Sequence, residues 1–266
     1  MFELVGRPDA SNRYPSAVMV YEQSPGGDTK LRQCGGVIVA PRLVLTAGHC
    51  VCHRRQASAP EGPPEYRIDA ATCAETAMVR IFFYEQDPRN PEQTRGFTYA
   101  ERQGRVRPHP ELQVRLGEQN QLLSSHADLT TIHLDEPVPI GFRAAVLAQG
   151  PAIPGEILMR VGFGYDNRLG SLDGRRLVQE SKVMRSLAPA DGLFLFEDTE
   201  GYVFRGDSGG PCFRETRAGP RLVGISTTGL GQQPTLISVQ PYWDWLRDEI
   251  SSAASAEKPR APGVPQ

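Results

Sequence analysis

Short runs of alternating or consecutive apolar residues recur along most of the chain. Alternation with a period of two is typical of half-buried β-strands, and short apolar runs bounded by turn residues are typical of buried ones. Such runs lie at 17–21, 36–39, 43–46, 78–84, 128–134, 156–161, 222–226 and 235–239. Turn residues at 25–27 and 173–174 separate some of them. The pattern predicts an all-β protein.

Only the last part of the chain has helical periodicity, and it predicts a terminal helix over 241–250 that opens on proline. The apolar residues at helical spacing are Tyr242, Trp245, Leu246 and Ile250. Residues 251–266 are small, polar and rich in proline, which predicts a disordered tail. Two polar stretches, 54–72 and 85–105, are predicted to be surface loops.

The net charge and the number of cysteines indicate which binding partners and which cellular compartment to expect. The net charge of −2 gives no electrostatic reason to expect binding to nucleic acid or to an anionic membrane. No apolar run reaches the roughly 18 residues of a membrane span, and the first ten residues do not resemble a signal peptide. Five cysteines are typical of an oxidising compartment. These observations favour a secreted or periplasmic protein and leave a cytoplasmic one open.

The strongest chemical signal is the segment 206–211, which reads Gly-Asp-Ser-Gly-Gly-Pro. A serine hydroxyl needs a base to become a nucleophile, and the oxyanion formed by its attack needs preorganised N–H donors. Glycines on both sides of Ser208 permit the sharply turned backbone that this requires. The hexapeptide resembles the nucleophile loop of the chymotrypsin/trypsin family of serine peptidases.

Two further segments carry the same resemblance. Residues 45–50, Leu-Thr-Ala-Gly-His-Cys, are similar to the segment that bears the catalytic histidine of that family. Asp128 opens an apolar run, as the family's catalytic acid does, whereas Asp69 and Asp87 lie in predicted loops. The chain order His49, Asp128, Ser208 is that of chymotrypsin and differs from that of subtilisin.

The resemblance extends over 4–250 and implies a fold and an activity. The fold would be two six-stranded antiparallel Greek-key β-barrels packed together, over about 4–135 and 136–240, followed by the helix at 241–250. The activity would be that of a serine endopeptidase in which His49 is the general base, Asp128 orients it and Ser208 is the nucleophile. Backbone N–H groups of Gly206 and Ser208 would form the oxyanion hole.

The resemblance also raises the question of activation. In animal-type members a freed N-terminal ammonium pairs with the aspartate before the nucleophile, which is Asp207 here. Residues 4–7 are similar to such a mature terminus, so an activating protease would cut before Leu4. Some bacterial relatives instead carry an arginine at the place of Arg160. We expect one of these two cations, and not both, to neutralise Asp207, because an unpaired buried carboxylate is costly.

Substrate preference follows from the same family pattern. Tyr202 stands where trypsin-like specificity needs an acid, so cleavage after Arg or Lys is not expected unless a small shift of the loop brings Glu200 to that place. The segment Thr227-Thr228-Gly229 would bind the substrate backbone as an added strand. Arg205, beside the oxyanion loop, could attract an acidic substrate group. The expected partners are protein or peptide substrates of a monomeric enzyme.

The five cysteines divide into two pairs and one thiol. Cys34 and Cys50 match a disulfide of the family, including their interval. Cys52 and Cys73 flank the stretch 54–72 and could close it, which leaves Cys212 as a buried thiol. The His and Cys residues at 49–53 fit no structural zinc site, so neither a metal nor a cofactor is expected.

Two alternatives to the peptidase remain open at this point. A catalytically silent member of the same fold could act as a binding protein, although such proteins usually lose the serine or the histidine. An esterase could use the same triad and would differ only in its substrates.

Overall fold

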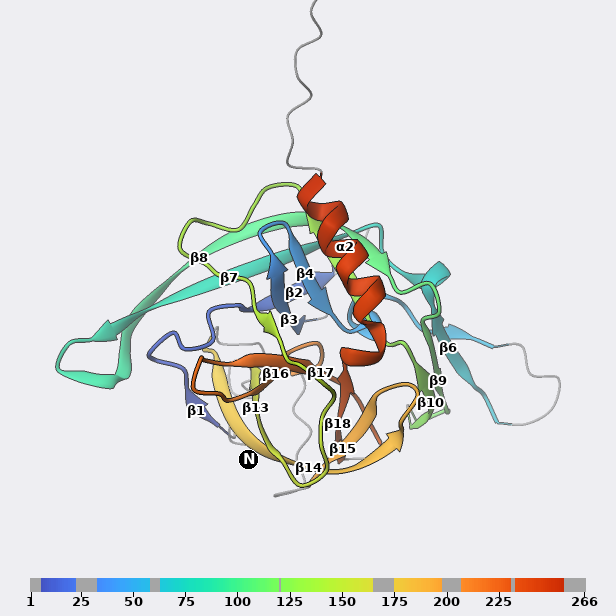
Figure 1. Ribbon diagram of the computed structural model, residues 1–266. Coiled ribbons are helices and arrows are strands. Elements are labelled where there is room, and N and C mark those ends of the chain that lie inside the picture. Colours follow the sequence, from blue (N-terminus) through green and yellow to red (C-terminus); the bar gives the residue numbers. More distant parts are fainter. Residues whose placement is uncertain are drawn as a thin grey trace, which may run out of the picture.

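The computed structural model describes seven ranges of the chain, namely 6–22, 33–57, 63–119, 121–164, 175–197, 207–230 and 233–255. Two β-barrels lie one above the other in Figure 1, and a single long helix packs beside them at the end of the chain. All pairs between neighbouring barrel strands are antiparallel. The prediction of two six-stranded antiparallel barrels with a C-terminal helix is therefore confirmed.

The first barrel closes in the order β11-β4-β3-β2-β7-β8. Its strands are β2 (Ala17–Glu22), β3 (Gln33–Ala40), β4 (Leu43–Thr46), β7 (Thr76–Asp87), β8 (Asn90–Pro108) and β11 (Thr130–Leu134). Strand β4 is buried along its whole length, which agrees with its three consecutive apolar residues, Leu43, Val44 and Leu45. Burial on both faces places β4 inside the structure, directly before the histidine segment.

The second barrel runs β14-β13-β16-β17-β18-β15 and closes through pairing of β14 with β15. Its strands are β13 (Ile157–Gly162), β14 (Leu177–Ala188), β15 (Leu193–Phe196), β16 (Pro211–Arg214), β17 (Arg221–Leu230) and β18 (Gln233–Ser238). Two short strands pair with strands of this barrel, β1 (Arg7–Pro8) with β14 and β12 (Val146–Leu147) with β17.

A separate four-stranded sheet, the side sheet, lies beside the first barrel in the order β10-β9-β6-β5. Its strands are β5 (Arg55–Gln56), β6 (Tyr66–Asp69), β9 (Gln113–Leu116) and β10 (Leu122–His126). The helical segments are α1 (Gly48–Val51), η1 (Ala70–Thr72), η2 (Gln240–Tyr242) and α2 (Trp243–Ser255). The side sheet therefore begins just after α1 and ends just before Asp128.

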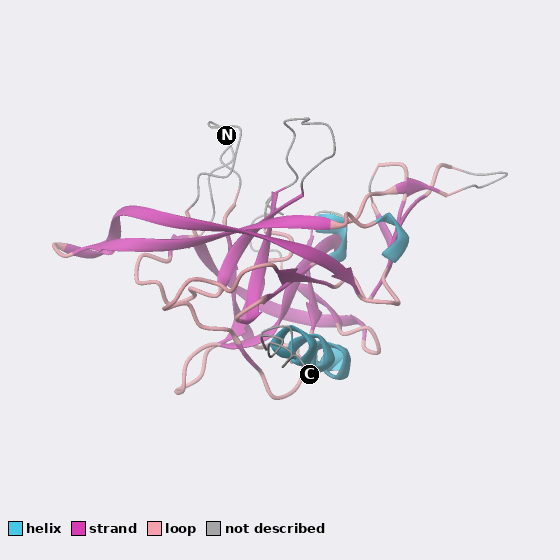
Figure 2. Cartoon of the chain, turned by 90° about the horizontal axis from the view of Figure 1, so that it is seen from above, coloured by secondary structure: helices cyan, strands magenta, loops and turns pink. Residues whose placement is uncertain are grey.

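The two stretches predicted to be surface loops are largely regular structure. Residues 90–105 belong to the 19-residue strand β8, which pairs with β7 in a long ribbon that projects from the barrel (Figure 2). The prediction failed because the ribbon is solvated on much of its surface, so its sequence is polar. Its aromatic residues pair across the strands, Phe82 with Tyr99 and Tyr84 with Phe97. Within 54–72, the described residues include β5, β6 and η1.

The terminal helix also extends further than predicted. Helix α2 ends at Ser255, five residues beyond Ile250, so 251–255 are helical and not part of a disordered tail. Ala253 is buried against the core, which gives the added turn a packing contact. Residues 256–266 lie outside the described residues.

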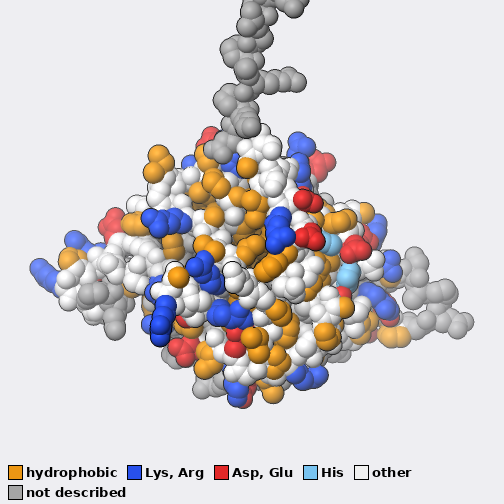
Figure 3. Space-filling view, in the orientation of Figure 1, with side chains coloured by type: hydrophobic (Ala, Val, Ile, Leu, Met, Phe, Trp, Pro, Cys, Tyr) orange, Lys and Arg blue, Asp and Glu red, His pale blue; other side chains and the backbone are white. Residues whose placement is uncertain are grey.

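The described part of the chain contains no helix that is long and apolar enough to span a membrane. The face of the molecule in Figure 3 carries basic and acidic side chains among many apolar and neutral ones. This mixed surface agrees with the small net charge of the sequence.

Candidate active site

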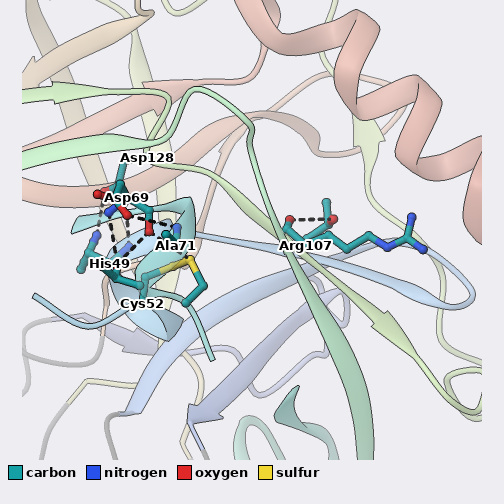
Figure 4. Close-up of a disulfide and its surroundings, with 9 residues drawn as sticks. His49, Cys52, Asp69, Ala71, Arg107 and Asp128 are labelled. Atoms are coloured by element: carbon teal, nitrogen blue, oxygen red, sulfur yellow. Dashed lines mark hydrogen bonds and ion pairs between the residues drawn. A yellow bond between two sulfur atoms is a disulfide. The ribbon is translucent and has the colours of Figure 1, made fainter. Parts of the chain in front are cut away.

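His49 is held in place by the elements on both sides of it. It lies in the single turn of α1, directly after the buried strand β4. A disulfide joins Cys50 to Cys34 on β3, and a second one joins Cys52 to Cys73 at the end of η1. Both predicted pairings are confirmed, and Figure 4 shows the second one close to His49. The two cross-links fix the helical turn to the barrel and to the side sheet.

The carboxylate of Asp128 accepts two hydrogen bonds from His49. The Nδ1 atom of His49 lies 2.7 Å from Oδ2 of Asp128, and the backbone N–H of His49 donates to Oδ1 at 2.9 Å (Figure 4). Gly48 makes this approach feasible, because a Cβ atom there would lie 2.6 Å from a methyl group of Leu112 and 3.0 Å from Oδ1 of Asp128. The carboxylate therefore fixes both the ring and the backbone of His49.

Asp128 is fully buried and receives a third donor, the hydroxyl of Thr227 on β17. Burial alone would raise the pKa of Asp128, but the charge of His49 and the hydrogen bonds from His49 and Thr227 outweigh it, so the pKa lies below its ordinary value. The carboxylate is therefore stabilised in its ionised form.

Asp69 and Asp87, the two aspartates in the predicted loops, have other roles in the structure. Asp69 caps η1 by accepting from the backbone N–H of Ala71, and Asp87 accepts from the backbone of Arg89 in the turn of the ribbon. Neither makes a hydrogen bond or ion pair to His49 among those described, whereas Asp128 makes two.

The Ser208 loop lies against the segment that leads into α1. The carbonyl of Ser208 accepts a hydrogen bond of 2.7 Å from the N–H of Gly35, the neighbour of Cys34 on β3. Gly209 has a φ of +78°, and a Cβ atom there would overlap the carbonyl of Gly35 and the hydroxyl of Thr46. These contacts place the Ser208 loop against β3 and the end of β4, close to the segment that carries His49.

Asp207 points its carboxylate into the second barrel. Its Oδ1 accepts from the N–H of Gly164 at 3.2 Å, and a side chain at Gly162 would overlap the carboxylate. Burial raises the pKa of Asp207, and the positive charge of Arg160 and the Gly164 N–H lower it only in part. Arg160 is itself buried, and its guanidinium lies over the ring of Phe196. No ion pair joins Arg160 to Asp207 in the described part of the chain.

The remaining predicted site residues divide into two groups. Leu4, Tyr202, Arg205 and Gly206 lie outside the described residues. The backbone of Thr228 and Gly229 belongs to β17, next to Thr227. The predicted substrate-binding residue Thr227 uses its hydroxyl to hold Asp128, a role that the sequence analysis did not assign. The sequence does not single this hydroxyl out, because Ser226, Thr227 and Thr228 are consecutive hydroxyl residues in β17.

Cys212 is a buried free thiol, as predicted. Its sulfur lies 3.6 Å from the hydroxyl of Ser226, and burial raises its pKa to about 11. It is therefore a neutral thiol at ordinary pH. Among the described residues no group of three His, Cys, Asp or Glu side chains could hold a metal ion.

Two antiparallel β-barrels, a serine loop packed against the first of them and a histidine paired with a buried aspartate are the features of the two-barrel serine peptidase folds. The family model described as Trypsin matches residues 4–246, and the chain therefore belongs to the trypsin family. The chain is also similar to human granzyme M (Homo sapiens), with 25% identity over 232 residues, which cover 83% of this chain and 80% of granzyme M.

Proposed function

We propose that this protein is a serine endopeptidase whose triad is His49, Asp128 and Ser208. The observation that carries the proposal is the pair formed by His49 and the fully buried Asp128, which accepts three hydrogen bonds from His49 and Thr227. A structural histidine on the surface would not need a buried anion fixed to this extent. Membership of the trypsin family also supports a serine peptidase function.

The pair determines which ring nitrogen acts as the base. With Nδ1–H donating to Asp128, Nε2 removes the proton from the Ser208 hydroxyl as its oxygen attacks the peptide carbonyl. His49 then protonates the leaving amine, and water repeats the sequence to release the acid. Asp128 stabilises the imidazolium that forms in each half of the reaction. The backbone N–H groups of Gly206 and Ser208 are the proposed oxyanion donors.

Asp207 is the proposed switch for that oxyanion loop. Its raised pKa means that the buried carboxylate is incompletely compensated, so a cation beside it would stabilise the loop. Arg160 exerts a favourable charge on it already, while cleavage before Leu4 would supply an ammonium group instead.

The mass of the active protein distinguishes the two partners of Asp207. If Leu4 is the partner, only molecules that have lost Met1, Phe2 and Glu3 will hydrolyse substrate, and the chain would be a zymogen before the cut. Full activity of the intact chain, lost in Arg160→Met, would assign the role to Arg160.

For specificity we propose cleavage that does not require Arg or Lys at the scissile bond, because Tyr202 replaces the acid of trypsin. The backbone at Thr227, Thr228 and Gly229 would pair with an extended substrate. Arg205 would favour acidic side chains, which a library of peptides with varied charge can test. Two disulfides support an oxidising compartment, so we propose that the protein is secreted or periplasmic.

Hydrolysis of an unfolded protein substrate tests the proposed activity. We expect Ser208→Ala to lower kcat by about a million-fold, because triad members act as a unit. Wild-type protein that cleaves esters but no peptide would support an esterase. Folded wild-type protein that hydrolyses neither substrate, both intact and after cleavage before Leu4, would support a silent binding protein.

A further inference from the structure

A cluster of buried aromatic and apolar residues lies where the ribbon of β7 and β8 meets the second barrel. The members of this aromatic cluster are Met19, Tyr21, Phe82, Tyr84 and Phe163. The first four come from β2 and β7 of the first barrel, whereas Phe163 follows β13 of the second barrel. The cluster therefore joins elements of both barrels.

Phe163 stands between two glycines that enclose the carboxylate of Asp207. The N–H of Gly164 donates to Asp207, and Gly162 lies so close to the carboxylate that no side chain would fit there. Gly164 has a φ of +54°, so this short segment takes a turn that few other residues adopt. The ring of Phe163 is buried in the aromatic cluster, which fixes the segment on its other side.

Phe82 is the main contact of Phe163 within the ribbon. The two ring centroids are 5.4 Å apart, a separation typical of favourable aromatic pairs. Phe82 also contacts Phe97 and Tyr99 on β8, with centroid distances of 5.4 Å and 6.0 Å. A continuous path of packed rings thus leads from the ribbon, through Phe163, to the residue before Ser208.

We propose that Phe82 and Phe163 are positioning residues for the nucleophile loop, and that the ribbon contributes to catalysis through them. This inference rests on the proposed peptidase function. Packed interiors transmit small displacements, so truncation of Phe82 would leave a cavity beside Phe163 and allow the segment 162–164 to move. Asp207 would then lose its fixed N–H donor, and Ser208 would lose its alignment with His49.

The chain offers a matched control one residue away. Phe83 lies on the same strand but points to the opposite face, where it is 50% exposed and touches Phe142. Phe83→Ala removes the same atoms as Phe82→Ala and leaves the aromatic cluster intact. Phe82→Leu refills most of the cavity and serves as the conservative variant.

The test measures the rate at which a fluorophosphonate labels Ser208 over a range of pH, at a temperature where each variant is folded. We expect Phe82→Ala to lower the plateau rate by between about tenfold and a hundredfold, since misplacement by about 1 Å has an effect of this size. Phe82→Leu should recover much of the rate, and Phe83→Ala should keep it within about twofold. The midpoint of the pH profile should not move.

Equal labelling rates in folded Phe82→Ala and Phe83→Ala would overturn the inference. If Phe82→Ala does not fold, Phe163→Leu takes its place in the test. A lower plateau labelling rate with an unchanged midpoint of the pH profile would support the inference, and an unchanged plateau rate would overturn it. Wild-type protein that is folded but not labelled, both intact and after cleavage before Leu4, would instead refute the proposed function on which the inference rests.

Discussion

A buried aspartate with three donors is the residue on which the site depends. The backbone geometry around Asp128 is unusual, because Ala127 has a φ of +46° and the N–H of Leu129 folds back onto the Ala127 carbonyl at 2.6 Å. A non-glycine residue in this conformation costs free energy, so its surroundings must hold it there. The hydroxyl of Tyr242 does so in part by accepting from the Ala127 N–H. This turn directs the carboxylate of Asp128 toward His49.

Thr227→Val tests the contribution of the third donor to Asp128. The change keeps the shape of the side chain and removes its hydroxyl, so the buried carboxylate loses a hydrogen bond. A hydrogen bond to a charged group is worth about 1.5–3 kcal/mol, so we expect kcat/KM for a peptide substrate to fall by about ten- to a hundredfold.

Thr130→Val is the control for that change. Thr130 is also a fully buried threonine, but its hydroxyl has no hydrogen-bond partner within the described ranges. We expect its kcat/KM to stay within about twofold of wild type. Thr227→Val with the same kcat/KM as Thr130→Val would show that this hydroxyl has no role in the site.

The terminal helix α2 is attached to the first barrel by a polar contact within an apolar interface. Glu249 accepts from the hydroxyl of Thr131 at 2.8 Å and lies at hydrogen-bond distance from the ring of His133, both on β11. Burial alone would raise the pKa of Glu249, but its hydrogen bonds with His133 and Thr131 and nearby positive charge hold that pKa below its ordinary value of 4.5. The ionised carboxylate therefore stabilises the folded protein.

The sign of the resulting pH dependence follows from this lowered pKa. The contribution of Glu249 to the free energy of unfolding is present above about pH 4.5, the unfolded value, and is lost as the pH falls through the lower folded value. We expect Glu249→Gln to be less stable than wild type at neutral pH and to approach it in acid. Denaturant unfolding at a series of pH values measures this difference.

Asp244→Asn provides the comparison on the same helix. The side chain of Asp244 is 98% exposed and pairs only with Arg247 among the described residues, so its removal should change stability little at any pH. A constant gap between Glu249→Gln and wild type down to strong acid would contradict the assignment to Glu249.

Elements that are buried on both faces were predictable from the sequence, and those that depend on tertiary pairing were not. The predicted bounds of β4 are correct because its apolar residues are consecutive and follow the turn at Pro41 and Arg42. Strand β14 was missed because its ladder is irregular, with register shifts between Val183 and Arg185 and between Ser186 and Ala188. These shifts break the alternation that a sequence pattern would reveal.

The same distinction applies to the site. The His49, Asp128 and Ser208 segments carry local motifs, so the sequence alone identifies the candidates. The hydroxyl of Thr227 reaches Asp128 from 99 positions away, on a strand of the other barrel. No local pattern encodes such a contact, because it exists only once both barrels have formed and packed.

At the scale of the whole molecule, the N-terminal segment connects the two barrels. Arg176, fully buried just before β14, donates from Nε to Asp9 at 2.8 Å and from Nη2 to Asn12 at 3.1 Å. Its guanidinium lies 4.9 Å from the ring of Tyr84 on β7 of the first barrel, and its backbone N–H donates to the Tyr84 hydroxyl. The buried ion pair and these contacts thus fix the segment 9–12 to both barrels.

Removal of the Asp9 carboxylate alone, with Arg176 left in place, should destabilise the fold strongly. We expect Asp9→Ala to lower the free energy of unfolding by about 3–5 kcal/mol, because it leaves the buried charge of Arg176 without its carboxylate. The double change Asp9→Leu with Arg176→Met removes both charges and should cost less than the single change. Denaturant unfolding measures both, and a loss below about 1 kcal/mol for Asp9→Ala, as for a surface pair, would contradict this account.

The central claim is that Ser208 is a nucleophile activated by His49. Treatment of the folded protein with a fluorophosphonate, followed by peptide mapping in a mass spectrometer, tests it most directly. The account predicts one phosphonylated residue, Ser208, in the wild-type protein, and almost no modification in His49→Ala, because the hydroxyl then lacks its base. Absence of the label from Ser208 in folded wild-type protein, tested both intact and cut before Leu4, or equal labelling in His49→Ala, would contradict it.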